Sequence, residues 1–256
     1  MYHYRIIPFS GRRADVDMSR LESYVKYWGN SANAGNYVLD RAKANYELVL
    51  FLEHIPHALE TWLPENPNKL QKTLDDLRTT ISFLRTKGII HFDAHFRNIL
   101  TDGKRTYLTD FGLVLDKSFT LTKDEKSFFK QNTFYDYGEV LRNLSHLIRS
   151  PYDLCSENDK RRMMEKYGIK EGLKHYELRS ILLDNIEQIH ADGIMQLDDF
   201  YVTSIVKYRR IIALMQDFFA DMWENDLKDT KFRGAELRRL LKETGFLLGE
   251  GTHGRH

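Results

Sequence analysis

The chain has 256 residues, a length that suits one or two domains with a substantial core. Hydrophobic residues make up 42% and charged residues 29%, and the net charge of +1 gives no reason to expect nucleic acid or an anionic membrane as a partner. No run reaches the apolar length of a membrane span, and no secretory signal opens the chain. Cys155 is the single cysteine, which excludes an intramolecular disulfide, so we expect a cytoplasmic protein.

The first part of the chain predicts a small β-containing region. Residues 1–9 are typical of a strand, residues 17–28 of a helix, and residues 46–53 of a second, largely apolar strand. A turn at residues 53–56 and a short helix over residues 58–63 follow. A buried strand leading into a turn would have the same sequence over residues 46–56.

A helix and a hairpin are predicted next. Gly88 ends the helix, because glycine adopts the left-handed conformation of a helix cap at little cost. Two short strands, over residues 98–100 and 106–108, flank Asp102-Gly103, which favours a tight hairpin turn. The helix is indicated by apolar residues at steps of three and four: Leu70, Leu74, Leu77, Ile81 and Leu84.

Polar residues with a specific chemistry flank this hairpin. The stretch His91-Phe92-Asp93-Ala94-His95-Phe96-Arg97-Asn98 precedes it, and Asp110-Phe111-Gly112 follows it. Loop, hairpin and second loop would bring Asp93, Asn98 and Asp110 to one end of the hairpin. Carboxylate and amide oxygens are the hard ligands that Mg²⁺ prefers, with phosphate oxygens and waters completing its octahedron.

With these motifs, residues 46–148 resemble the protein-kinase-like superfamily. The resemblance implies an α+β fold with a short N-terminal lobe, and ATP and Mg²⁺ as cofactors. It also implies that Asp93 is the catalytic Asp, that Asn98 and Asp110 are the magnesium ligands, and that His91 braces the loop by bonding backbone near Asp110.

Two departures from the protein-kinase pattern bear on the acceptor. Phe92 stands where protein kinases usually carry Arg, so control by an activation-loop phosphate is not expected. His95 stands where they usually carry Lys, and a His there is similar to the aminoglycoside and choline kinase branch, which phosphorylates small molecules. We therefore expect His95 or Arg97 to contact phosphate or the acceptor.

The nucleotide-binding residues of this superfamily are harder to place. By position, the carbonyl of Glu53 and the N–H of Ile55 would bond the adenine edge at a hinge between lobes. No Gly-rich loop is visible, and Arg5 could replace the usual strand Lys, with Glu22 as its partner. Arg5 and Glu22 are more typical of exposed charges than of such a pair, so we expect that the small lobe is abbreviated or that the chain begins inside a longer protein.

The remainder predicts a large helical lobe, so the expected division is residues 1–55 and residues 56–256. Thr122 to Glu125 has the pattern of a capping box, and a helix over residues 137–148 is led by Asp136, which by resemblance bonds the catalytic-loop backbone. Buried stripes are expected over residues 201–222 and 237–247, with solvated basic flanks at residues 207–210 and 238–239. The Gly-rich residues 249–256 are expected to fray.

The sequence thus predicts a phosphotransferase that moves the γ-phosphoryl group of ATP to a hydroxyl acceptor. A small molecule is favoured over a protein, because no Ala-Pro-Glu follows Gly112. A pseudokinase without turnover is the alternative. A metal-hydrolase site with His91 and His95 as ligands is a third interpretation, which leaves Asn98 and the Asp-Phe-Gly turn without a role.

Overall fold

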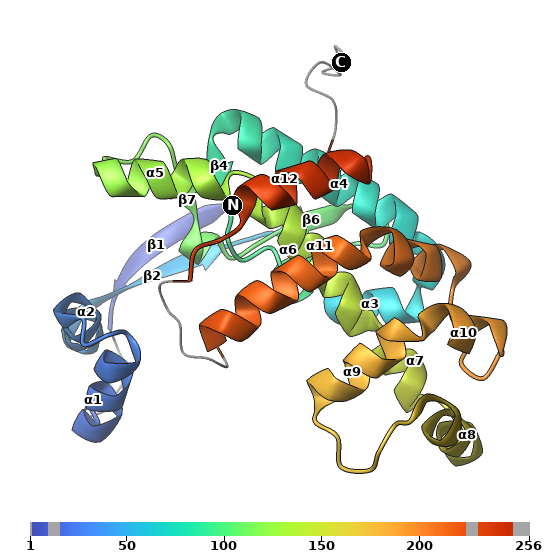
Figure 1. The fold of residues 1–256 in the computed structure, drawn as a ribbon. Coiled ribbons are helices and arrows are strands. Elements are labelled where there is room, and N and C mark those ends of the chain that lie inside the picture. Colours follow the sequence, from blue (N-terminus) through green and yellow to red (C-terminus); the bar gives the residue numbers. More distant parts are fainter. Residues whose placement is uncertain (1, 10–15, 224–229, 248–256) are drawn as a thin grey trace. The chain divides into compact units, whose positions relative to one another are not determined.

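The computed structural model describes residues 2–9, 16–223 and 230–247 and combines helices with small antiparallel sheets (Figure 1). The chain divides into two compact units, Met1–His54 and Ile55–His256. The division falls one residue before the boundary expected from the sequence. Residues 249–256, expected to fray, lie outside the described residues.

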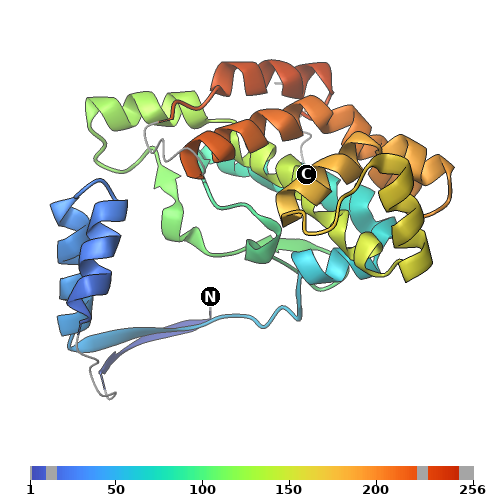
Figure 2. The same cartoon turned by 60° about the horizontal axis from the view of Figure 1, so that its bottom comes forward.

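The first unit contains a two-stranded antiparallel ribbon and a pair of packed helices, visible in Figure 2 as the blue segments. The ribbon places His3 opposite Phe51. Asp17 begins the first helix, where its carboxylate accepts hydrogen bonds from the N–H groups of Ser19 and Arg20. The elements are β1 (His3–Pro8), α1 (Met18–Tyr27), α2 (Ala32–Lys43) and β2 (Tyr46–Phe51).

The second strand differs from its prediction. It ends at Phe51, two residues early, and it is not a buried strand, since Leu48 and Leu50 are 62% and 49% exposed. A ribbon of only two strands is too small to bury one of its faces, so the apolar side chains of β2 stay accessible.

The second unit is built around four helices that pack on one another: α4 (Leu70–Lys87), α6 (Tyr135–Leu147), α11 (Asp199–Trp223) and α12 (Gly234–Glu243). In Figure 1, α11 and α12 run beside α6. The predicted stripe of α4 is buried, and Gly88 caps this helix with φ +77°. Smaller helices complete the unit: α3 (Leu59–Glu65), α5 (Lys123–Asn132), α7 (Arg149–Asp153), α8 (Glu157–Tyr167), α9 (His175–Asp184) and α10 (Ile186–Ala191).

Five short strands lie between these helices. The central strand of a three-stranded sheet is β5 (Ile99–Thr101), which pairs with β3 (His57–Ala58) and β6 (Thr106–Leu108). A separate pair joins β4 (Ile89–Ile90) to β7 (Leu115–Asp116).

The predicted hairpin is present, but its turn is longer than expected. Thr101 pairs with Thr106, so four residues form the loop instead of a tight two-residue turn. The Asp102 carboxylate accepts hydrogen bonds from the N–H groups of Lys104 and Arg105 at 2.8 and 2.7 Å. Asp102 thereby organises the longer loop from within.

The predicted helix signals downstream are confirmed. Thr122 and Glu125 form a reciprocal capping box at the start of α5. Tyr208 on α11 is buried while its neighbours Lys207 and Arg209 are exposed, so the basic clusters are solvated flanks.

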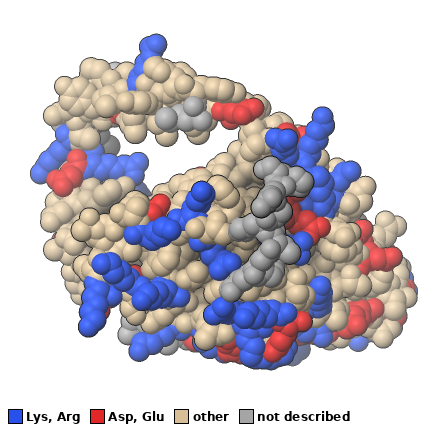
Figure 3. Space-filling view, turned by 90° about the horizontal axis from the view of Figure 1, so that it is seen from above, with Lys and Arg blue, Asp and Glu red and all other residues tan. Residues whose placement is uncertain are grey.

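On the face seen in Figure 3, basic side chains cover more of the surface than acidic ones but do not form one continuous patch. Lys and Arg lie there in several separate groups, with Asp and Glu beside some of them. Among the described helices, none has the length and apolar character needed to cross a bilayer.

Candidate active site

The loop that follows β4 is anchored by a buried carboxylate. The backbone N–H groups of His91 and Phe92 donate to the two oxygens of Asp136 at 2.8 and 2.9 Å. Asp136 lies in the first turn of α6 and is 4% exposed. This is the role predicted for Asp136, and it connects the loop to the helical core.

Asp136 has an unusual titration because two effects oppose each other. Burial, the larger effect, raises the pKa of its carboxyl to about 6, whereas the hydrogen bonds from His91 and Phe92 lower that pKa.

Phe92 has a φ of +64°, a conformation that costs a non-glycine residue about 1–3 kcal/mol and persists only when the surroundings enforce it.

His91 braces the two loops against each other. Its fully buried ring donates from Nε2 to the Thr109 carbonyl at 2.9 Å, and its Nδ1 accepts from the N–H of Asp93 at 3.2 Å. Burial lowers the pKa of His91, which favours the neutral ring that this arrangement requires. Both ring nitrogens are therefore engaged, which leaves neither of them free to bind a metal in this structure.

Asp93, His95 and Asn98 form one cluster. The Asn98 amide nitrogen donates to the Asp93 carboxylate at 2.7 Å and to the Asp93 carbonyl at 3.1 Å. The other oxygen of the Asp93 carboxylate lies 3.4 Å from Nε2 of His95. Nδ1 of His95 accepts from the backbone N–H of Asn98 at 3.3 Å, which holds the imidazole in place.

The hairpin brings the second loop to this cluster. The N–H and hydroxyl of Thr109 both donate to the Asn98 carbonyl, at 2.8 and 2.9 Å. Asp110 is the next residue, has a left-handed φ of +56°, and accepts a hydrogen bond from the N–H of Gly112. Asp93 and Asn98 are thus in contact at the end of the hairpin, and Asp110 directly follows Thr109, which is bonded to the backbone of Asn98.

Two oxygens at this end could hold a hard cation. The amide oxygen of Asn98 and one carboxylate oxygen of Asp110 accept no hydrogen bond within the described chain. The described residues contain no group of three or more His, Cys, Asp or Glu side chains that could hold a metal by themselves. Two protein oxygens suit Mg²⁺, which keeps several waters and takes substrate phosphates as ligands.

The residues predicted to bind the nucleotide lie in the first unit or at the point in the sequence where the second unit begins. Arg5 is exposed on β1, where its Nε donates to Nε2 of His3 at 3.2 Å, and the structure does not join it to Glu22. Glu53 and Ile55 stand on either side of the division between the units. The Glu53 carbonyl and the Ile55 N–H make no hydrogen bond within the described chain.

Two supporting residues were not predicted. The Asn143 amide oxygen accepts from the N–H of Phe96, and Glu60 binds Nε of Arg97 through both carboxylate oxygens at 3.0 and 2.9 Å. Asn143 follows Asp136 by two helical turns and lies on the same face of α6 as Asp136 and Glu139, so this helical spacing was its only local signal. Glu60 gave none.

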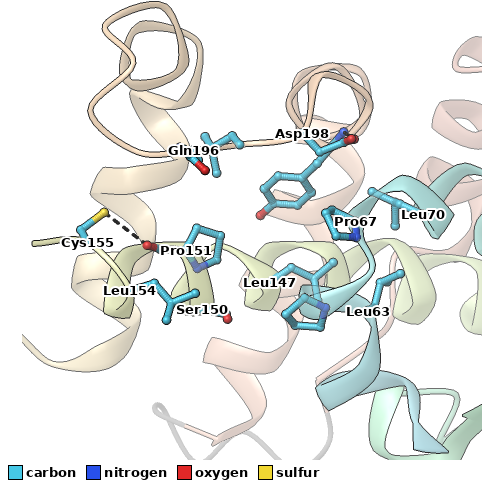
Figure 4. A pocket seen from close by; sticks show the side chains of 13 residues that line it. Leu63, Pro67, Leu70, Leu147, Ser150, Pro151, Leu154, Cys155, Gln196 and Asp198 are labelled. Atoms are coloured by element: carbon cyan, nitrogen blue, oxygen red, sulfur yellow. Dashed lines mark hydrogen bonds between the residues drawn. The ribbon is translucent and has the colours of Figure 1, made fainter.

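A pocket of about 670 Å³ lies next to α7, away from the predicted site residues (Figure 4). Leucine and proline side chains dominate its wall, and the Cys155 thiol donates to the Pro151 carbonyl beside it. Burial raises the pKa of the Cys155 thiol, which favours the unreactive thiol form. None of the predicted site residues lines this pocket.

Comparison of the chain with protein-family models, with curated proteins and with solved structures found no match. Its functional assignment therefore depends on its own residues and their geometry.

Proposed function

We propose that this protein has a protein-kinase-like fold and transfers the γ-phosphoryl group of Mg-ATP to a hydroxyl acceptor, with a small molecule favoured over a protein. The observation that carries the proposal is the cluster at the hairpin end. Asn98 bonds the Asp93 carboxylate directly, and Thr109 fixes the adjacent Asp110 beside Asn98. Phosphoryl transfer needs such positioned oxygens more than it needs covalent chemistry from the protein.

Each residue of the cluster has a distinct task in this proposal. Asp93 orients the acceptor hydroxyl and takes its proton, and the Asn98 amide holds that carboxylate in position. Asn98 and Asp110 hold Mg²⁺, which supplies charge neutralisation on the phosphates. His95 contacts the acceptor or its phosphate, since Arg97 is already engaged by Glu60.

A pseudokinase is the second candidate, favoured by specific observations on the first unit. The sequence has no Gly-rich loop before residue 46, and Arg5 bonds His3 instead of Glu22. The nucleotide contacts expected of Arg5, Glu53 and Ile55 stay predictions.

Substitution of Asp93 tests the proposal. In Asp93→Asn, formation of ADP from Mg-ATP should fall by about 10²–10⁴-fold because the general base is lost. Binding of Mg-ATP, measured by calorimetry, should change less than twofold. Asp124→Asn, at an exposed position in the first turn of α5, is the matched control and should keep both properties.

Two outcomes would count against this assignment. Unchanged ADP formation in Asp93→Asn would remove Asp93 from the chemistry, and loss of Mg-ATP binding would make its role structural. A wild-type protein that binds Mg-ATP but forms no ADP would favour the pseudokinase.

A further inference from the structure

A second pocket, of about 570 Å³, borders the catalytic loop itself. Phe96 and Arg97, which follow His95 in that loop, line one part of its wall. Arg149 and Arg179, from α7 and α9, line another part. The pocket lies entirely within the second unit, and no task has been assigned to it so far.

The charges in the wall are unequally paired. Arg97 binds Glu60, and Nε of Arg149 lies 2.7 Å from the Asp153 carboxylate. Arg179 makes no hydrogen bond or ion pair with any residue that the structure describes, and its Nε is fully buried. A buried donor without a partner lowers stability, and the cost is larger when the donor is charged.

The histidines of the wall supply no counter-charge for the Arg179 guanidinium. Burial lowers the pKa of His146 to about 3, with help from the nearby charges of Arg142 and Arg179, so His146 is neutral near pH 7. His175 accepts a hydrogen bond at Nδ1 from Arg149. Burial and the proximity of Arg142 lower the pKa of Arg179, as expected of a guanidinium without a counter-ion.

Other half-buried arginines of the second unit differ from Arg179. Arg142 forms two hydrogen bonds with Glu139 and lies over the Phe219 ring. Arg85 also has an unbonded Nε, but its guanidinium lies over the ring of Phe134. Among the described residues, Arg179 has no carboxylate within ion-pair distance and its guanidinium lies over no aromatic ring.

We propose that this pocket binds the oxyanion group, carboxylate or phosphate, of a small molecule, and that this molecule is the acceptor. Arg179 supplies the counter-charge, because a guanidinium presents paired donors that match carboxylate and phosphate oxygens. The wall formed by Phe96 and Arg97 places the ligand against the loop that carries Asp93 and His95. The assignment as acceptor rests on the proposed function, whereas the anion site stands without it.

A thermal-shift titration with sodium phosphate, and separately with sodium succinate, tests the anion site. Nucleotide and metal are omitted, and the ionic strength is held constant with sodium chloride. Wild type should show a saturable rise in Tm with at least one of the two anions, and Arg179→Gln should bind that anion at least tenfold more weakly. The anion that binds more tightly identifies phosphate or carboxylate as the preferred group.

The control is Arg162→Gln, which removes an exposed arginine of α8 and should match wild type. Arg179→Gln itself should unfold at the same temperature as unliganded wild type or higher, because it removes an uncompensated charge. Arg179→Lys keeps the charge without the paired donors and should bind at least threefold more weakly than wild type. It carries the test if Arg179→Gln does not fold.

Equal responses in wild type and the Arg179 variants, or no saturable response, would overturn the anion site. In that case the side chain of Arg179 would only cover apolar surface with its aliphatic part. Asp110→Ala should keep the wild-type anion response, since Asp110 does not line this pocket. An Arg179-dependent response in a protein that fails the Asp93 test would preserve the anion site and refute only its role as the acceptor pocket.

Discussion

At the scale of single residues, the loop that carries Asp93 is held by a strained backbone and one buried carboxylate. Phe92 adopts its left-handed φ while its ring stacks on Phe128 and contacts Tyr135, with centroids 5.5 and 5.3 Å away. Asp136 accepts both N–H groups of the bend. Hydrogen bonds to a charged acceptor contribute about 1.5–3 kcal/mol each, enough to offset the strain.

The titration of Asp136 predicts how stability depends on pH. The pKa is about 6 in the folded state against 3.8 for the ordinary carboxyl, so the folded protein holds this proton more tightly. The resulting stabilisation is complete below pH 3.8 and is lost as the pH rises through 6. A pKa difference of about two units corresponds to about 3 kcal/mol.

Asp136→Asn removes this titration, so urea unfolding of both proteins between pH 4 and 7 isolates it. The unfolding free energy of wild type minus that of Asp136→Asn should fall by about 2.4 kcal/mol across this range. A difference that stays constant with pH would mean that the two hydrogen bonds lower the pKa as much as burial raises it, and a difference that rises with pH would mean that they lower it more.

Single residues also show the limits of prediction from sequence. The bracing role of His91 and the anchoring role of Asp136 could be predicted, because both belong to a recognisable motif. The roles of Glu60 and Arg179 could not be predicted, because they depend on side chains that are distant in the sequence. Glu60 binds Arg97, whereas no described side chain bonds Arg179.

At the scale of elements, local signals predicted helices better than strands. Gly88 and the Thr122 capping box mark helix ends, where backbone conformation and side-chain hydrogen bonds are set by neighbours in sequence. The strands β3, β4 and β7 have two residues each, too few for any alternation to appear. β3 forms because it pairs with β5, and β4 and β7 form because they pair with each other. These pairings join segments that are distant in the sequence, so neighbouring residues do not reveal them.

Gly138 lies where α6 packs tightly against α11 and α12. A Cβ atom at this position of α6 would lie 2.6 Å from Sδ of Met215 on α11 and 3.0 Å from Leu237 on α12. Gly138→Ala should therefore lower the unfolding free energy by about 1–2 kcal/mol, since overpacking exceeds the gain in helix propensity.

A double-mutant cycle with Met215→Val provides the control, because valine lacks the Sδ atom. Denaturant unfolding of the two single variants and the double variant should reveal a favourable coupling of about 0.5 kcal/mol or more. Additive effects, or a stabilised Gly138→Ala, would show that the helices can separate without cost.

At the scale of the whole molecule, Asp93, Asn98 and Asp110 all belong to the second unit, which has one hydrophobic core formed mainly by helices. The resemblance implied the α+β class, and periodicity predicted the large helical part. They did not predict the exposure of the β1–β2 ribbon, because an apolar strand pattern does not say whether another layer covers it.

The central claim is that the hairpin end holds magnesium on a bound nucleotide. A thermal-shift titration with ATP, with and without Mg²⁺, on wild type, Asp110→Ala and the control Asp124→Ala tests it most directly. Ligand at a hundred times its Kd adds about 2.7 kcal/mol, which raises the Tm of a protein of this size by several degrees. We predict a magnesium-dependent rise in wild type and the control that is absent in Asp110→Ala; an equal rise in Asp110→Ala, or none in wild type at millimolar ATP, would contradict the account.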